Sequence, residues 1–371
     1  MSSAALSLAR RITSITAHLQ SGMARPKVVV TRNLGAEAMR LLDRSDLDVV
    51  AWHSETQPCD KKWLYDNIPG ATGILLLFSE KVDQEFLDAA GPTLKVVSTM
   101  SVGYEHIDVK ALAQRGIKLG YTPDVLTEAV ADITVMLALM AGRNVKETTT
   151  IVQNGQWSAY PWAPYLFCGS QLSANWLQPT RTAGFLGFGR IAQSTLARLL
   201  PFGFTRALYT GNPSSQPKPA RDAEMHAKYA SQGLAEFRRV DIAELARESD
   251  VVFVLAPGEP STYHVVNEEF LRAMKKTAVL VNTSRGSLVD SEALAKACRE
   301  GWISGAGVDV VEGEPHVPAD HPLVKEPRCV VLPHIGSATN ETRLGMGTMA
   351  INNVIAGVLG GNMPAELNMS R

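Results

Sequence analysis

Three short stretches combine residue types that bind anionic groups and transfer protons. They are residues 282–286 (NTSRG), 307–315 (GVDVVEGEP) and 332–339 (LPHIGSAT), and they contain Arg285, Glu314 and His334. Each coincides with or follows the end of an apolar run typical of a buried strand, so each lies at the carboxyl end of a predicted strand. Open parallel α/β sheets bind their ligands at this edge. The three stretches are therefore expected at the edge of the sheet where a ligand would bind.

Each of these residues also has a purely structural interpretation. Arg285 could cap a helix or pair with Asp290, and His334 could complete a hydrogen bond in the core. Glu314 could be one more charge on an acidic loop that also holds Glu312. For each residue taken singly, the structural interpretation is the favoured one.

A glycine-rich turn precedes these stretches. Residues 187–192 (GFGRIA) fit the pattern GxGxxG/A and lie between a predicted strand and a predicted helix. In this context Gly187 allows a tight turn, Gly189 allows close approach of a pyrophosphate, and the small Ala192 allows helix–strand packing. The amino end of the helix then supplies N–H groups and a positive dipole to the phosphates. A dinucleotide site is predicted, with a merely structural glycine turn as the alternative.

The acidic residue that commonly binds the ribose of NAD is missing. The second predicted strand of this region ends at Thr210, Gly211 and Asn212, and the sequence has no Asp or Glu between Gly187 and Asp222. A carboxylate there would repel a 2′-phosphate, whereas hydroxyl, amide and basic side chains could bind one. Residues of these kinds follow in Ser214, Ser215, Lys218 and Arg221. NADP(H) is therefore favoured over NAD(H), the alternative being a solvated Ser/Pro loop without a role in selectivity.

With these motifs in order, the sequence resembles the D-2-hydroxyacid dehydrogenase family from about residue 27 to its end. It is most similar to the glyoxylate/hydroxypyruvate reductase branch, in residues 209–211 (YTG), 332–339 and 363–367 (MPAEL). The resemblance implies that Arg285, Glu314 and His334 are catalytic. Arg285 would also bind substrate, together with the backbone N–H groups of Val102 and Gly103 in the stretch 101–108 (SVGYEHID).

The chemistry of the family explains these residue types. Reduction of a 2-oxo acid needs a hydride at the carbonyl carbon and a proton at its oxygen. The planar fork of Arg285 would hold carboxylate and carbonyl oxygens. His334 would be the general acid in reduction and the base in oxidation, because histidine titrates near neutrality, and Glu314 would orient its ring and favour imidazolium.

The resemblance also implies a cofactor-binding set, in which Asp309 faces the nicotinamide and Thr127 contacts its carboxamide. The full set comprises Thr127, Gly187, Gly189, Arg190, Ile191, Thr210, Gly211, Asn212, Thr283, Asp309 and Gly336. This chain departs from the branch at Asn212, where arginine is common, and in residues 170–181, which form a longer link than usual. The other histidines considered are assigned to structure or loops: His106, His264, His316 and His321.

Two alternating series of short apolar runs and helical patterns predict two doubly wound parallel-sheet α/β domains. The resemblance implies a flavodoxin-like substrate domain (25–126 and 335–371) and a Rossmann cofactor domain (127–334), with the active site in the cleft. Residues 127–143 predict a buried helix because they are almost uncharged, and residues 337–359 predict a helix that returns to the first domain. The irregular stretch 154–181 is interpreted as the first domain junction.

This stretch contains four aromatic residues: Trp157, Tyr160, Trp162 and Tyr165. They either pack internally or, as in the reductase branch that the sequence resembles, reach across a dimer.

Composition excludes several classes of protein. The 371 residues are 45% hydrophobic and 20% charged, and 36 Lys and Arg nearly balance 37 Asp and Glu, so neither a nucleic-acid partner nor a membrane is expected. The four cysteines form no CxxC pair, so neither a disulfide framework nor a metal site is indicated.

Residues 1–24 hold arginines and serines but no acidic residue, which is typical of a mitochondrial transit peptide. The alternatives are a disordered tail and an extension before a start at Met23. The expected location is cytoplasmic or mitochondrial.

The resulting hypothesis is a homodimeric reductase of small 2-oxo acids, glyoxylate and hydroxypyruvate, that uses NADPH and forms D-2-hydroxy acids. One alternative is another D-2-hydroxyacid dehydrogenase that uses NADH. A second, of a different class, is a dinucleotide-sensing scaffold similar to the C-terminal-binding-protein corepressors.

Overall fold

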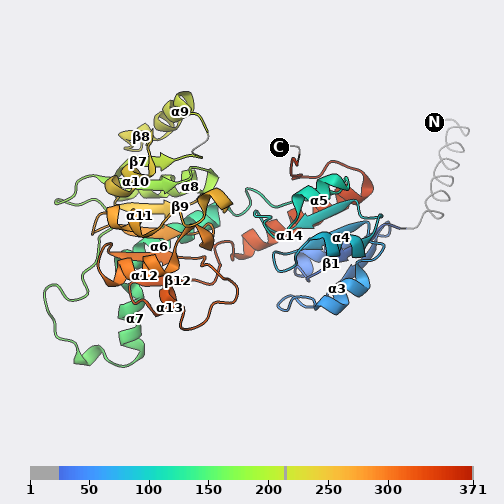
Figure 1. The fold of residues 1–371 in the computed structure, drawn as a ribbon, viewed down its shortest axis with the longest axis horizontal. Coiled ribbons are helices and arrows are strands. Elements are labelled where there is room, and N and C mark those ends of the chain that lie inside the picture. The colour runs from blue at the N-terminus through green and yellow to red at the C-terminus, as the bar shows by residue number, and fades with distance from the viewer. Residues whose placement is uncertain (1–24, 213–214, 370–371) are drawn as a thin grey trace, which may run out of the picture. The chain divides into compact units, whose positions relative to one another are not determined.

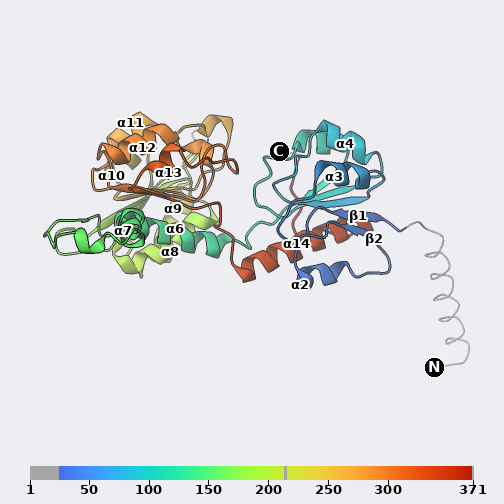
Figure 2. The same ribbon diagram turned by 90° about the horizontal axis from the view of Figure 1, so that it is seen from below.

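The computed structural model describes residues 25–212 and 215–369 (Figures 1 and 2). The targeting segment predicted at residues 1–24, and Ser214 of the candidate cofactor loop, lie outside these ranges. The chain divides into two compact units: the first holds the residues up to Val125 and those from Asn340 on, and the second holds Leu126–Thr339. Residues 154–180 belong to the second unit, so the interpretation of this stretch as a domain junction is wrong. No helix in the described ranges is long and apolar enough to cross a bilayer.

The described residues of the first unit form a five-stranded parallel sheet in the order β2-β1-β3-β4-β5, which is the flavodoxin-like order. Its strands are β1 (Lys27–Val30), β2 (Asp48–Ala51), β3 (Gly73–Leu76), β4 (Val96–Thr99) and β5 (Lys118–Gly120). Its helices are α2 (Ala36–Met39), α3 (Lys61–Asn67), α4 (Gln84–Ala90), α5 (Val109–Gln114) and α14 (Asn340–Leu359), with a 3₁₀ turn η1 at Arg40–Leu42.

Helix α14 covers one face of the first sheet although it is the last helix in the chain. It lies with α2 on the face opposite α3 and α4 (Figure 2). Its Gly357 has no side chain where Val96 of β4 approaches, and the Ser98 hydroxyl of β4 donates to the Ala350 carbonyl at 2.8 Å. The other face packs on α3, α4 and α5 through Leu64, Phe86 and Leu112.

The second unit contains, within the described ranges, a seven-stranded parallel sheet in the order β12-β11-β10-β9-β6-β7-β8. This order contains the 3-2-1-4-5-6 arrangement of dinucleotide-binding folds. The strands are β6 (Arg181–Leu186), β7 (Phe204–Thr210), β8 (Glu236–Arg239), β9 (Val251–Val254), β10 (Val279–Asn282), β11 (Gly305–Val308) and β12 (Cys329–Val331). The prediction of two doubly wound parallel-sheet domains is confirmed.

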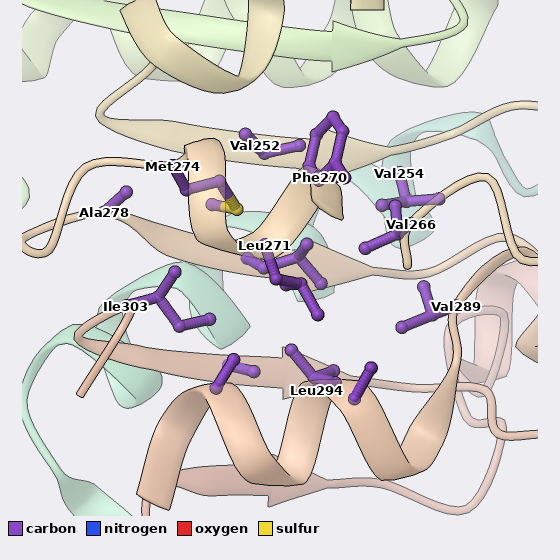
Figure 3. Close-up of a cluster of buried hydrophobic side chains, with 14 of the residues drawn as sticks. Val252, Val254, Val266, Phe270, Leu271, Met274, Ala278, Val289, Leu294 and Ile303 are labelled. Carbon is purple, nitrogen blue, oxygen red and sulfur yellow. The ribbon is translucent and has the colours of Figure 1, made fainter. Parts of the chain in front are cut away.

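Helices cover both faces of the second sheet (Figure 2). They are α6 (Thr127–Gly142), α7 (Val145–Gln153), α8 (Arg190–Leu199), α9 (Pro219–Ala230), α10 (Ile242–Glu248), α11 (Glu268–Ala273), α12 (Ser291–Arg299) and α13 (Pro322–Lys325), with 3₁₀ turns η2 (Trp157–Ala159), η3 (Leu200–Phe202), η4 (Pro260–Thr262) and η5 (Gly286–Leu288). The apolar helix α6 packs on β10, β11 and α8, which explains its low charge. Phe270 and Leu271 of α11 and Leu294 of α12 pack with β9 residues in a large buried cluster (Figure 3).

Short polar side chains fix where several helices begin. The carboxylates of Asp60, Asp83, Asp241 and Asp290 each accept a hydrogen bond from the backbone N–H three residues on. Asp290 therefore caps α12, accepting from Ala293 at 3.0 Å, which is a different role from the pairing with Arg285 considered above.

Candidate active site

The candidate catalytic residues follow three neighbouring strands of the second sheet. Arg285 follows β10, Asp309 and Glu314 follow β11, and His334 follows β12. These strands are adjacent and parallel, so their carboxyl ends meet at one edge. The glycine-rich turn lies at the same edge, after β6, and Thr210 ends β7. Parallel α/β sheets bind ligands along this edge.

His334 and Glu314 form a direct pair. The His334 Nδ1 atom lies 2.9 Å from Glu314 Oε1, while Glu314 Oε2 accepts the Val311 N–H at 3.1 Å. Because a carboxylate only accepts, Nδ1 must be the protonated nitrogen of this pair. Exchange of a proton with a substrate would then occur at Nε2.

Asp309 holds the turn that carries His334. Its side chain is buried, and its two oxygens accept the N–H groups of Ile335 at 2.8 Å and Gly336 at 2.7 Å. Its carbonyl accepts the His334 N–H at 2.9 Å. These bonds stabilise a left-handed backbone at His334, with φ of 55°, which is uncommon for a residue other than glycine. Burial raises the pKa of Asp309, against the opposing effect of the two backbone N–H groups.

Asp309 is thus a positioning residue in this structure. Its assignment as a cofactor contact, and that of Gly336, rests on the resemblance alone. The Gly336 N–H is already the donor to Asp309.

The turn that carries Arg285 is built by Asn282. The Asn282 amide donates to the Arg285 carbonyl at 2.9 Å and accepts the Ser284 N–H at 3.1 Å. The Arg285 guanidinium donates to the Ser284 carbonyl at 2.7 Å. Gly286 then packs on the acidic loop so closely that a Cβ there would lie 2.1 Å from the Val311 carbonyl carbon. The turn of Arg285 and the loop of Glu314 are therefore fixed against each other.

A second histidine–carboxylate pair ties the same loops together. His264 Nε2 lies 3.0 Å from Glu312 Oε2, and the His264 backbone N–H donates to the Ser287 carbonyl at 2.9 Å. The Tyr263 ring stacks on the imidazole with centroids 3.9 Å apart. His264 is therefore part of the support of the site, a contact that its isolated position in the sequence did not reveal.

The glycine-rich turn has the geometry needed to receive a pyrophosphate. Gly187 has φ of 86°, and a Cβ there would lie 2.8 Å from the Ala256 Cα. Gly189, before α8, has open space where a side chain would be, and no side chain caps the amino end of the helix. Arg190 and Ile191 are the first two residues of α8, so their backbone lies at its positive end. Ala192 is buried against the sheet. The residues present thus fit a dinucleotide.

The end of β7 lies beside this turn. The Gly187 N–H donates to the Thr210 carbonyl at 3.2 Å, and Gly211 and the exposed Asn212 follow. The Tyr209 hydroxyl donates to Asp222 at 2.5 Å, and burial together with that carboxylate raises the pKa of Tyr209 to about 12.

Two threonines of the proposed cofactor set lie on or against α6. Thr127 is its first residue, and Thr283 pairs with Thr134 at 2.8 Å between the hydroxyls. Since the Thr134 hydroxyl donates to the Val130 carbonyl, Thr283 is the donor in that pair. The Thr283–Thr134 hydrogen bond therefore connects the end of β10 with α6.

Val102 and Gly103 lie in the first unit, after β4. A chain of hydrogen bonds braces their loop: His106 Nε2 to Thr99 Oγ1 at 3.1 Å, Thr99 to Ser101 Oγ at 2.7 Å, and Ser101 to the Gly103 carbonyl at 2.6 Å. Within the described ranges, the N–H groups of Val102 and Gly103 have no acceptor. Such N–H groups suit a carboxylate.

Comparison with known proteins identifies the chain. A family model described as D-isomer specific 2-hydroxyacid dehydrogenase, NAD binding domain, matches residues 135–336. The chain is 42% identical over 344 residues to the human glyoxylate reductase/hydroxypyruvate reductase, covering 92% of this chain and 98% of that protein. It is also 42% identical to the glyoxylate reductase of Thermofilum pendens, over 93% and 95% of the two chains.

One similar protein of known structure was solved with bound ligands. The chain is similar, with a TM-score of 0.73 and 29% identity over 94% and 98% of the two chains, to an NADPH-dependent glyoxylate/hydroxypyruvate reductase from Sinorhizobium meliloti in complex with NADP and malonate. Similarity that extends across both units makes this chain an oxidoreductase that uses a nicotinamide dinucleotide. It belongs to the D-isomer specific 2-hydroxyacid dehydrogenase family.

Proposed function

We propose that this protein reduces glyoxylate and hydroxypyruvate to D-2-hydroxy acids with NADPH, and that His334 is the general acid. The observation that carries the proposal is the 2.9 Å pair of His334 and Glu314 in the same strand-end region as the turn of Arg285. The relatives named for this activity support the choice of substrates.

The residues divide the reaction between them. When bound, the nicotinamide supplies the hydride to the carbonyl carbon. Arg285 holds the substrate oxygens through its planar fork, and the N–H groups of Val102 and Gly103 are the donors that we assign to the carboxylate. His334 gives its Nε2 proton to the carbonyl oxygen and keeps its Nδ1 proton, which it donates in a hydrogen bond to Glu314. The product state is therefore the Nδ1-protonated tautomer that this pair already favours.

The cofactor set proposed from the resemblance divides into two groups. The turn of Gly187 and Gly189 with the first residues of α8 would hold the pyrophosphate. Thr210, Gly211 and Asn212 would face the adenosine ribose, where the absence of a carboxylate favours NADPH.

A substrate panel tests the proposal. Purified protein is mixed with NADPH or NADH and a series of 2-oxo acids, and loss of the reduced nicotinamide absorbance is followed. We expect turnover with glyoxylate and hydroxypyruvate and a higher kcat/KM for NADPH. Turnover restricted to other 2-oxo acids, or a preference for NADH, points to another dehydrogenase of the family. Tight dinucleotide binding without turnover points to a sensing scaffold.

We also propose that the protein is a homodimer that buries the aromatic segment 157–177. Trp162 is 98%, Tyr165 88% and Trp176 87% exposed in the single chain, so these residues do not pack internally. Several large apolar side chains this exposed within one segment are typical of protein interfaces. Light scattering after size-exclusion chromatography should give twice the chain mass; a monomer that turns over substrate contradicts the proposal.

A further inference from the structure

Arg239, near the end of β7, differs from the neighbouring Arg206 and Arg238 in having no carboxylate partner among the described residues. Arg206 on β7 and Arg238 on β8 share Glu236, at 2.6 and 2.5 Å, and each has a second acidic partner in Glu248 or Glu244. Arg239 donates instead to two backbone carbonyls, those of Ser215 at 2.8 Å and Asn212 at 2.9 Å. Its positive charge is therefore not neutralised within the described part of the chain.

Arg239 lies at the place where the fold receives an adenosine ribose. A Cβ built on Gly211 would be 3.3 Å from the Arg239 Cζ atom, so the guanidinium covers the first residue after β7. This is the strand end at which NAD-dependent folds place an acid and NADP-dependent folds place an arginine nearby. Two of the five N–H groups of a guanidinium serve the carbonyls, which leaves three to donate elsewhere.

Other charges near this strand end define the electrostatic setting. Arg221 on α9 donates to the Phe188 carbonyl at 2.9 Å, between the two glycines of the phosphate turn. Both Arg221 and Arg239 act on the Tyr209 hydroxyl through their charge. The nearby acid is Asp222, and its carboxylate already accepts the Tyr209 hydroxyl. The two cations thus lie beside the strand end, where the Asp222 carboxylate opposes their charge.

We propose that Arg239 binds the 2′-phosphate of NADP(H), and so supplies from β8 the cation that is missing at Asn212. This inference rests on the NADPH preference proposed above and names the residue responsible for it. The ligand it recognises is a ribose 2′-phosphate monoester, which a guanidinium binds through paired charge-assisted hydrogen bonds.

Binding measurements on the full chain test this assignment without relying on activity. Calorimetry with 2′,5′-ADP and 5′-AMP, and nicotinamide fluorescence with NADPH and NADH, give Kd values for the wild type, Arg239→Gln and Arg239→Lys. Arg238→Gln is the matched control, because it removes the same charge from the adjacent residue of the same strand. Thermal unfolding shows that each variant is folded.

We expect Arg239→Gln to raise the Kd of 2′,5′-ADP and NADPH about 10- to 100-fold, the effect of one charged hydrogen-bonding group. The Kd of 5′-AMP and NADH should change less than about threefold, as should every Kd of Arg238→Gln. Arg239→Lys keeps the charge and loses the fork, so it should fall between wild type and Arg239→Gln.

Three results would overturn the assignment, and each has a different meaning. If Arg239→Gln weakens NADPH and NADH equally, Arg239 only holds the turn after β7. If the wild type prefers 2′,5′-ADP and the variant keeps that preference, the NADPH proposal stands and Arg239 is the wrong residue. A wild type that binds 5′-AMP as tightly as 2′,5′-ADP refutes the NADPH preference itself, and the assignment of Arg239 with it.

Discussion

Replacement of Asp309 by Asn tests whether one buried carboxylate positions the catalytic histidine. The aspartate accepts the backbone N–H groups of Ile335 and Gly336, one on each oxygen, and is 2% exposed. Asparagine has one acceptor oxygen and puts an NH₂ group where the other oxygen was. In the Asn variant, one of these two backbone N–H groups would therefore face the NH₂ donor, with no acceptor, inside the protein.

The size of the effect follows from these contacts. A buried N–H left without an acceptor costs about 1–3 kcal/mol. Burial raises the pKa of Asp309, which means that the ionised carboxylate carries a desolvation cost. Removal of its charge in the Asn variant recovers part of this desolvation cost. We expect a net loss of about 1–2 kcal/mol in the free energy of unfolding. Because the same turn carries His334, a shift of about 1 Å should lower kcat by about 10- to 100-fold.

The matched control is Asp250→Asn. Asp250 is also buried and accepts the Thr182 N–H at 2.8 Å, but it lies at the opposite edge of the sheet, before β9. Thermal unfolding and steady-state kinetics are measured for both variants. Both should lose stability, and only Asp309→Asn should lose kcat. If the two variants lose stability alike and both keep kcat, Asp309 does not position His334.

Four further predictions follow from the site and the surface. His334→Ala should lower kcat by about 10²- to 10⁴-fold with little change in the Kd of NADPH; near-normal kcat would remove the residue from the mechanism. Arg285→Lys keeps the charge but not the fork, so KM for 2-oxo acids should rise at least about tenfold, and unchanged kinetics would contradict its role as a clamp. Thr210→Asp should move the ratio of kcat/KM for NADPH and NADH by about 10- to 100-fold toward NADH at fixed salt, and an unmoved ratio would place the 2′-phosphate elsewhere. Burial raises the pKa of Cys329 to about 12, so iodoacetamide at neutral pH should modify the exposed Cys168 first, as peptide mass spectrometry would show; equal labelling of the two in folded protein would contradict this.

The sequence predicted those strands whose side chains are buried on both faces, because these form continuous apolar runs. It did not reveal β8, since Glu236, Arg238 and Arg239 make a four-residue edge strand mostly polar. Helix α7 was missed for a related reason. Its sequence, with three consecutive threonines, has a weak helical propensity, and only Ile151 is buried.

The predicted catalytic residues came from motifs, whereas the residues that support them are visible only in three dimensions. Asp309 stands in the GVDV stretch, but its two bonds to the turn of His334 depend on the pairing of β11 with β12. Arg239 reaches Asn212 across 27 residues because β7 pairs with β8. His264 looked like a loop residue, and its contact with Glu312 spans 48 residues.

The position of α14 in the chain also determines the order in which the protein can fold during synthesis. The second unit is continuous, from Leu126 to Thr339, and is complete before α14 leaves the ribosome. The first unit begins earlier, yet the sheet face that carries α2 lacks its cover over β4 until Ala350 and Gly357 arrive. The unit whose synthesis starts first is therefore the last to complete its packing, and part of its sheet is exposed until then.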